Sequence, residues 1–236
     1  MRKPAGASAS AINSLFKKIT MNTTVNKLFD DTERVFNFHE SDNVKPVMEK
    51  YGYSEAKISE GKTLFEATRA ACNRYAKEYG EQLQAYATLE SRLAPCRERY
   101  SLDLEIARFV FKNHADAQST LELNGRRKHS FTGNYAQMVD FYDRLTVNAS
   151  WVAAMAKMQV TPEKLTAQKA ELTAIRKFKD DHSRERGEAQ QAIIDRDRML
   201  DQLDEWVSDY VKVAGFALAA TPQLLEGLNK VIRAKS

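Results

Sequence analysis

Apolar residues recur at steps of three and four along two long stretches of the chain, the spacing of one face of a helix. In the first stretch they are Ile58, Phe65, Cys72, Tyr75, Tyr79, Tyr86, Leu89, Leu93, Cys96, Tyr100, Ala107 and Phe111. In the second they are Leu165, Leu172, Ile175, Ile193, Leu200, Leu203, Val207, Tyr210 and Ala214, interrupted by a polar interval at residues 179–191 that we expect to be solvated. Such heptad-like seams are typical of long packed helices. The pattern predicts an all-α fold, with long helices over about residues 54–113 and 161–219 and almost no strand.

The same pattern occurs twice because the sequence repeats itself. Sliding the chain by 107 residues aligns residues 54–111 with residues 161–218 without a gap, and 14 of the 58 aligned pairs are identical. Self-similarity at one fixed offset indicates a repeated structural unit. We therefore predict an elongated helical bundle made by tandem duplication. Its parts would be a disordered basic tail (1–21), a first helical repeat (22–125) and a second (126–236), the two repeats packed as one unit.

Both long helices carry matching start signals. Ser54 and Thr161 occupy equivalent positions and suit an N-cap, and Pro162 suits the first helical position. Shorter helices are predicted near residues 24–38, 42–50, 135–147 and 150–157, with two more starting near residues 116 and 221.

Gly80 and Gly187 are aligned by the repeat and allow two interpretations. Each could be a hairpin turn that splits its long helix, or each helix could run on as a rod of about 90 Å. In a continuous helix a glycine costs about 1 kcal/mol relative to alanine, so something should offset it. A close crossing of the two long helices near Gly80 and Gly187 would do so, and this is the interpretation we favour. Pro95 could bend the first rod.

Several segments resemble a family of uncharacterised bacterial helical proteins built from two tandem repeats. They are GYSEAKISEGKTLFEA, the midpoints EYGEQ and ERGEAQ, GRRKHSFTGNYAQMVDFY at the joint, and the ending PQLLEGLN. The resemblance implies an all-α fold and no assigned activity. One position departs from the family, which has an arginine before the last apolar run of both halves; here it is Arg108 in the first repeat but Gly215 in the second.

The location of the charge matters more than its sum of +4. Residues 1–20 hold four basic residues and no acid, so the other 216 residues carry 32 basic and 32 acidic side chains. A general nucleic-acid binder needs a basic surplus, and the body of the chain has none, which argues against this class. The basic tail carries Leu15, Phe16 and Ile19 and could make a weak membrane-surface contact. No apolar run reaches the length of a membrane span.

Cys72 and Cys96 are the only two cysteines. Their 24-residue spacing corresponds to about 36 Å along an unbroken helix, too far for a disulfide between them. Unpaired thiols fit a reducing compartment, so we predict a cytoplasmic location.

The chemistry-bearing residues form no recognisable catalytic constellation. The four histidines make neither Glu-x-x-His nor His-x-x-x-His, and no phosphate-binding glycine loop or nucleophile elbow is present. We therefore predict no catalytic residue, no metal ligand set and no cofactor. The strongest local candidate for anion or partner binding is Arg126, Arg127, Lys128 and His129 at the joint of the repeats. Clustered guanidinium groups suit anions, although the same residues could instead serve a helix end or neighbouring acids.

Two functions of different classes remain open. The preferred one is a non-enzymatic helical scaffold or interaction protein, for which a protein partner or a homodimer would be natural. The alternative is a small-molecule- or metal-binding helical bundle, with its site between the two long helices.

Overall fold

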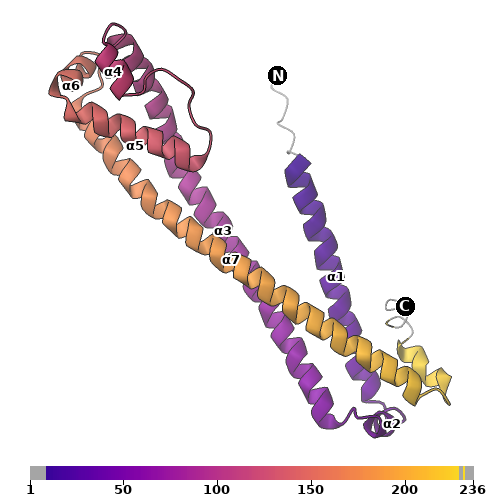
Figure 1. The fold of residues 1–236 in the computed structure, drawn as a ribbon. Coiled ribbons are helices and arrows are strands. Elements are labelled where there is room, and N and C mark those ends of the chain that lie inside the picture. The colour runs from indigo at the N-terminus through magenta and orange to yellow at the C-terminus, as the bar shows by residue number, and fades with distance from the viewer. Residues whose placement is uncertain (1–8, 229–230, 232–236) are drawn as a thin grey trace, which may run out of the picture. The chain divides into compact units, whose positions relative to one another are not determined.

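The computed structural model of the chain describes the backbone of residues 9–228 and 231, and side chains from residue 23 onward within that range. Every element in this part is helical, which confirms the all-α prediction. In chain order these elements are α1 (Ala9–His39), α2 (Lys45–Lys50), α3 (Glu55–Val110), α4 (Ala115–Thr120), α5 (Phe131–Val147), α6 (Ala149–Ala156), α7 (Pro162–Ala217) and a 3₁₀ helix, η1 (Pro222–Leu228) (Figure 1).

The two long helices are continuous. α3 and α7 have 56 residues each and pass without a break through Gly80 and Gly187, so the hairpin interpretation is wrong. Pro95 lies inside α3. Both helices begin with a side-chain cap: Ser54 Oγ accepts from the Lys57 amide at 3.4 Å, and Thr161 Oγ1 accepts from the Lys164 amide at 3.5 Å. These caps satisfy backbone donors that the first helical turn leaves unpaired.

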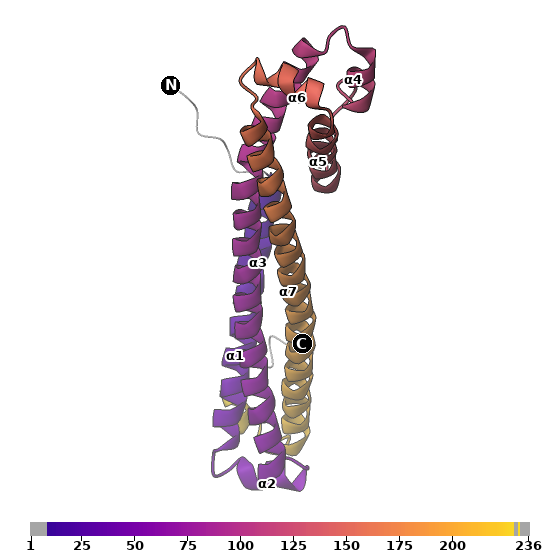
Figure 2. The same cartoon turned by 90° about the vertical axis from the view of Figure 1, so that its left-hand side faces the viewer.

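The chain folds into two compact units. Unit 1 comprises Met1–Ala76 and Gln190–Ser236, and unit 2 comprises Lys77–Ala189. Each unit therefore contains one part of α3 beside one part of α7, as both views show (Figure 1, Figure 2). The compact units cut across the two sequence repeats, because each unit joins the start of one long helix to the end of the other.

Unit 1 is organised around the aromatic ring of Trp206. Trp206 packs against Phe36, Tyr53 and Tyr210, with ring centroids 5.6 to 6.2 Å apart. A Cβ atom built on Gly61 would lie 2.3 Å from the Trp206 ring, so glycine at this position lets the indole lie against α3. The surrounding core includes Val35, Val44, Met48, Ile58, Phe65, Leu203, Val207, Ala214, Leu218 and Leu228.

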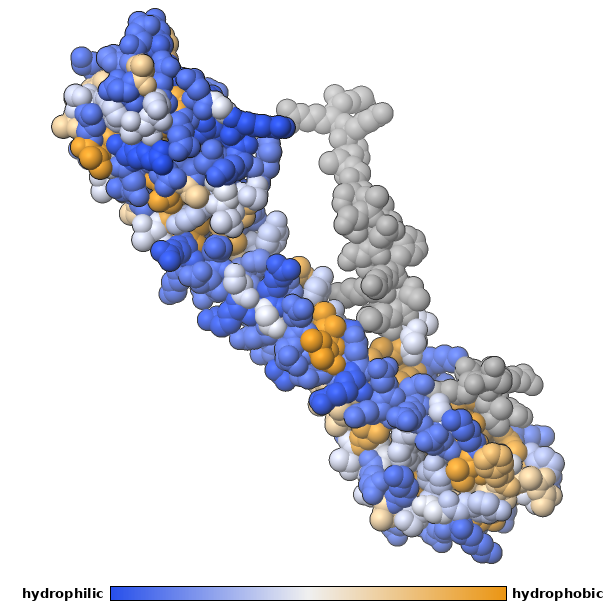
Figure 3. Space-filling view, in the orientation of Figure 1, coloured by the Kyte–Doolittle hydropathy of each residue, from blue (hydrophilic) through white to orange (hydrophobic). Residues whose placement is uncertain are grey.

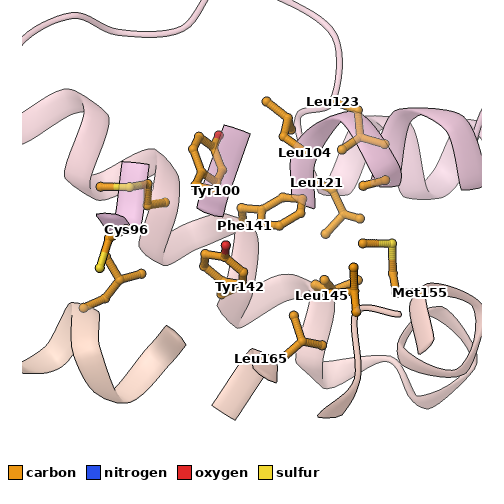
Figure 4. Packing of buried hydrophobic residues seen from close by; sticks show 14 of the residues in the cluster. Cys96, Tyr100, Leu104, Leu121, Leu123, Phe141, Tyr142, Leu145, Met155 and Leu165 are labelled. Carbon is orange, nitrogen blue, oxygen red and sulfur yellow. The ribbon is translucent and has the colours of Figure 1, made fainter. Parts of the chain in front are cut away.

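Unit 2 has a separate core in which α4, α5 and α6 pack on α3 and α7. Its centre is aromatic: the Tyr100 and Phe141 rings lie 5.4 Å apart, and the Phe141 and Tyr142 rings 5.1 Å apart. Figure 4 shows these rings beside Leu121, Leu145 and Met155. All of these side chains are at most 3% exposed, so the five helices share one continuous apolar cluster.

The 107-residue offset of the sequence recurs in the positions of the elements. α3 and α7 begin at residues 55 and 162 and end at 110 and 217. The turns before them match as well: Gly52 (φ 91°) and Gln159 (φ 65°) both adopt the left-handed conformation. Met48 and Met155 are equivalent and fully buried. A tandem duplication predicts all of these correspondences.

The predicted role of Gly80 and Gly187 needs correction. Apart from its own helix, neither glycine has an atom within 4 Å of where a Cβ would stand, and both positions are exposed. Neither glycine is therefore required for a close approach of the long helices. The glycine that a close packing does require is Gly61, whose aligned partner in the second repeat is Gln168.

The predicted tail lies mostly outside the described side chains. α1 begins at Ala9 and so extends into the segment 1–21 that the sequence assigns to a disordered tail. The side chains of Leu15, Phe16 and Ile19, on which the membrane-surface prediction depends, are not among those described. Among the described residues, no helix combines the length and the apolar character needed to cross a membrane.

Candidate functional sites

The duplicated Glu-x-Gly-Glu segments meet inside unit 2. Carboxylate oxygens of Glu78, Glu185 and Glu188 all lie within 4.8 Å of one another, so three acidic side chains converge between α3 and α7. Glu78 and Glu185 are equivalent in the two repeats, and Glu188 is the equivalent of Glu81. Glu78 is the most enclosed of the three, with 8% of its surface exposed.

Two basic residues partly offset the charge of these carboxylates. Lys77 Nζ lies 3.7 Å from Glu78 and 3.3 Å from Glu81, while Arg184 lies 2.9 Å from Glu185 and 3.9 Å from Glu188. Lys77 and Arg184 are themselves equivalent positions of the repeat. The same ion-pair pattern therefore occurs on both long helices.

A groove of about 530 Å³ runs beside this cluster in unit 2. Its walls carry Phe178 and Thr88 together with Asp181, Arg184 and Glu185. Nearby, the rings of Tyr86 and His182 are 5.7 Å apart. Part of the polar interval at residues 179–191 thus lines an open groove, in agreement with the expectation that it is solvated.

The basic segment at the joint divides into residues with different surroundings. Arg127 is held in place: its Nη1 donates to the Tyr100 hydroxyl at 3.0 Å, and its Nη2 donates to the Glu122 carbonyl. The backbone amide of Lys128 donates to Gln137 Oε1 at 2.8 Å, and the Lys128 side chain lies over Gly133. His129 is exposed and lines none of the hollows described below. Of the four residues predicted together, Arg126 and Arg127 line one hollow, whereas Lys128 and His129 are exposed outside it.

Arg126 and Arg127 line a hollow of about 380 Å³ beside α4. We call it the Arg126 hollow, and its other lining residues are Ala115, Gln118, Ser119, Glu122, Asn124 and Gln137. Glu122 is bridged to Arg144 at 2.7 Å, and this hydrogen bond lowers the pKa of the Glu122 carboxyl. The carboxylate in the hollow is thus paired with Arg144, which also lies 3.9 Å from Asp140.

Each unit also buries a hydrogen-bonded pair of polar side chains that the sequence pattern did not predict. In unit 2, Asp103 Oδ2 accepts from the Tyr142 hydroxyl at 2.9 Å and from Arg99 Nε at 3.1 Å. Burial raises the pKa of the Asp103 carboxyl. In unit 1, His39 Nδ1 lies 3.2 Å from the Tyr210 hydroxyl, and burial lowers the pKa of the His39 imidazole.

Large apolar side chains are exposed at equivalent positions of the two repeats. Phe109 is 62% exposed near the end of α3, and Phe216 is 72% exposed near the end of α7. Tyr51 and Met158, in the turns that precede the long helices, form a second equivalent pair at 53% and 42% exposure. The repeat alignment pairs Phe109 with Phe216, but sequence alone could not show that both rings point outward.

Both cysteines are free, as predicted. Cys96 is buried and Cys72 partly buried, and burial raises the pKa of both thiols. A raised thiol pKa disfavours the thiolate, the reactive form, which agrees with a structural role.

Comparisons with known protein families, curated proteins and solved structures find no match to this chain. The resemblance to two-repeat bacterial helical proteins therefore stays a prediction.

Proposed function

We propose that the protein is a non-enzymatic helical scaffold that binds a protein partner through exposed phenylalanines near the ends of its two long helices. The single observation that supports this proposal is the exposure of Phe109 and Phe216, identical residues at equivalent positions of the repeats. A single exposed apolar residue is ordinary on a protein surface. The same exposed aromatic in both copies is a stronger indication of a binding position, because aromatic side chains are enriched at interface centres.

The neighbourhoods of the two phenylalanines support the same interpretation. Phe109 lies between Ala107 and Phe111, which are buried in the unit 2 core. Phe216 lies between Ala214 and Leu218, which are buried in the unit 1 core. Each exposed ring therefore projects from a helix end that its own core holds in place. A binding residue on a rigid helix keeps its orientation, which lowers the entropy cost of association.

The visible face of the molecule in Figure 3 is mostly hydrophilic. Figure 3 shows apolar atoms reaching the surface in small groups on both units, among polar residues that cover most of the visible face. Scattered exposed apolar side chains suit a few anchor residues in a modest interface rather than a large permanent one.

The alternative function, a small-molecule or metal site between the long helices, has its best support at Glu78, Glu185 and Glu188. Three converging carboxylates are a plausible oxygen ligand set for a divalent cation. Lys77 and Arg184, however, already supply positive charge at hydrogen-bonding or ion-pair distance. Two cations therefore offset part of the negative charge of the cluster without a metal, so we rank this function second.

The cytoplasmic location also belongs to the proposal. Its support is the pair of free cysteines, Cys72 and Cys96, which fit a reducing environment.

Native mass spectrometry of the protein purified gently from its own host tests the proposal. We expect a stoichiometric protein partner, either another chain or a second copy, on the wild type. The double variant Phe109→Gln/Phe216→Gln should lose that partner. The matched control is Leu83→Gln/Ile194→Gln. These two apolar side chains are 50% and 55% exposed, but they are not at equivalent positions of the two repeats.

The outcomes separate the two functions. Loss of the partner in the phenylalanine variant alone supports the scaffold. A monomer without any partner in all three samples contradicts it. A metal or small molecule on the wild type that is lost in Glu185→Gln would move the preference to the alternative.

A further inference from the structure

We propose that the Arg126 hollow binds a phosphate group, with Arg126 as the principal contact. This site is independent of the scaffold function proposed above. It rests on three observations: the volume and lining of the hollow, the free guanidinium of Arg126 beside the hydrogen-bonded guanidinium of Arg127, and the hydrogen bonds that fix the surrounding side chains.

Arg126 is the available cation of the hollow. Its side chain is exposed, and among the described residues it makes no ion pair or hydrogen bond. An arginine guanidinium presents paired donors whose fork matches two oxygens of a phosphate. Arg126 can therefore engage a ligand without giving up a contact in the described fold.

Arg127 supplies positive charge from a fixed position. Its hydrogen bonds to the Tyr100 hydroxyl and to the Glu122 carbonyl connect the hollow to the unit 2 core. Tyr100 is 3% exposed, so this anchor is rigid. A fixed second cation increases the affinity for an anion, because little side-chain freedom is lost on binding.

The amide side chains of the wall are held by their own hydrogen bonds. Gln118 Nε2 donates to the carbonyls of Phe111 and Lys112 at 3.0 and 2.6 Å, and Asn124 Nδ2 donates to Gln118 Oε1 at 3.2 Å. Gln137 Oε1 accepts from the Lys128 amide, which leaves the Gln137 amide nitrogen as a donor. The wall thus combines ordered amides with two guanidinium groups.

The charge balance favours an anion. The only carboxylate of the lining is Glu122, and it is engaged by Arg144, whose Nη1 also donates to the Thr120 carbonyl at 2.9 Å. Arg144, Arg127 and Lys128 all help to lower the pKa of Glu122. With Glu122 paired, Arg126 and Arg127 leave a positive surplus in the hollow.

The size of the hollow selects among phosphate-bearing ligands. About 380 Å³ is at the small end of the range for ligand sites. We therefore expect inorganic phosphate or a small phosphomonoester. Both share the same phosphate chemistry, and affinity distinguishes them: an ester that binds more tightly than inorganic phosphate indicates that the hollow also holds the substituent.

Isothermal titration of the full chain with inorganic phosphate, and separately with glycerol 3-phosphate, tests the site. We expect saturable binding with a Kd on the order of 1 mM. Arg126→Gln should raise the Kd about tenfold or more, since a charge-assisted contact contributes about 1.5 to 3 kcal/mol. Lys128→Gln is the matched control. Lys128 carries the same charge and lies two residues from Arg126 in the sequence, but its side chain does not line the hollow. Its loss should change the Kd less than about twofold.

Two results would overturn the proposal. One is the absence of saturable binding of either probe to the wild type. The other is an equal loss of affinity in Arg126→Gln and Lys128→Gln, which would mean that the surface charge alone attracts the anion. Thermal unfolding of each variant checks the fold: Arg126→Gln should melt like the wild type, whereas Arg127→Gln should melt earlier because it loses the Tyr100 and Glu122 contacts.

Discussion

Unit 1 and unit 2 place different polar residues at one equivalent buried position. Asp103 on α3 aligns with Tyr210 on α7, and both side chains are at most 1% exposed. In unit 2 the partner is Tyr142 from α5, whereas in unit 1 it is His39 from α1. Two cores with matching helices therefore solve the same requirement, a partner for a buried polar group, with different residues.

The partners themselves are not at equivalent positions. The repeat aligns Tyr142 with Val35, and His39 with Thr146. Tyr142 and Thr146 are four residues apart, about one helical turn. The contact between the long helix and its neighbour is thus kept while the residue that makes it moves along the neighbour by one turn. The comparison teaches that the apolar pattern fixes the packing of the helices, while individual polar contacts can be exchanged within it.

The largest loss of stability should come from removing the carboxylate of Asp103 in unit 2. Asp103→Ala leaves the Tyr142 hydroxyl buried without its acceptor. We expect a loss of about 2 to 3 kcal/mol in the free energy of unfolding. In unit 1, Tyr210→Phe removes one hydroxyl and should cost about 1 kcal/mol.

Urea denaturation of both variants measures these costs, and hydrogen exchange locates them. Increased exchange should be concentrated in the unit that carries the change. If Tyr210→Phe proved the more costly of the two, the comparison between the units would be wrong.

Alanine substitutions at Gly61, Gly80 and Gly187 should have smaller effects on stability, and these should differ in sign. Gly61→Ala places a Cβ against the Trp206 ring and should destabilise the protein by about 1 to 2 kcal/mol. Gly80→Ala and Gly187→Ala meet no atom of the chain beyond their own helix, so each should stabilise it by about 1 kcal/mol through helix propensity. Melting curves of the three variants test this order, and a destabilising Gly80→Ala would restore the idea that a glycine is needed where the long helices meet.

The smallest effects should follow pH, with opposite signs in the two units. Burial is the largest cause of the lowered pKa of His39, with Glu40, Lys45, Glu49 and Lys62 as charged neighbours. As the pH falls below 6.5, the unfolded chain takes up this proton first, so unit 1 should lose stability. The variant His39→Gln should lack this part of the pH dependence.

Asp103 should act in the other direction. Its pKa is raised above the ordinary 3.8, chiefly by burial, so the folded state takes up the proton before the unfolded chain does. Its contribution is complete below pH 3.8 and is lost as the pH rises through the folded-state pKa. Hydrogen exchange measured at pH 7 and pH 5 and corrected for intrinsic rates tests both signs. On going from pH 7 to pH 5, protection should weaken near His39 and stay unchanged or strengthen near Asp103.

The sequence predicted the helices better than the contacts. The spacing of residues such as Ile58, Leu165 and Tyr210 reports which face is buried, because periodicity depends on only one helix at a time. The first residues of α3 and α7 followed from Ser54 and Thr161 for the same reason.

The candidate sites depended on long-range information that the sequence pattern lacks. The polar pair Asp103–Tyr142 joins residues 39 positions apart, and periodicity cannot identify which helices meet. Arg126 and Arg127 have different surroundings because the Arg127 guanidinium donates to the hydroxyl of Tyr100, a residue of α3. The glycine prediction failed similarly: the equivalent positions of Gly80 and Gly187 in the two repeats were visible, but whether another helix packs directly against these glycines was not.

The most direct test of the central claim asks whether something covers Phe109 and Phe216 in the protein's own environment. Hydroxyl-radical footprinting would compare their oxidation rates in a concentrated host lysate with those in the purified chain, using exposed Leu83 and Ile194 as references. We expect both phenylalanines to be oxidised more slowly in the lysate, while the references are unchanged. Equal rates in the two samples at both phenylalanines would contradict it.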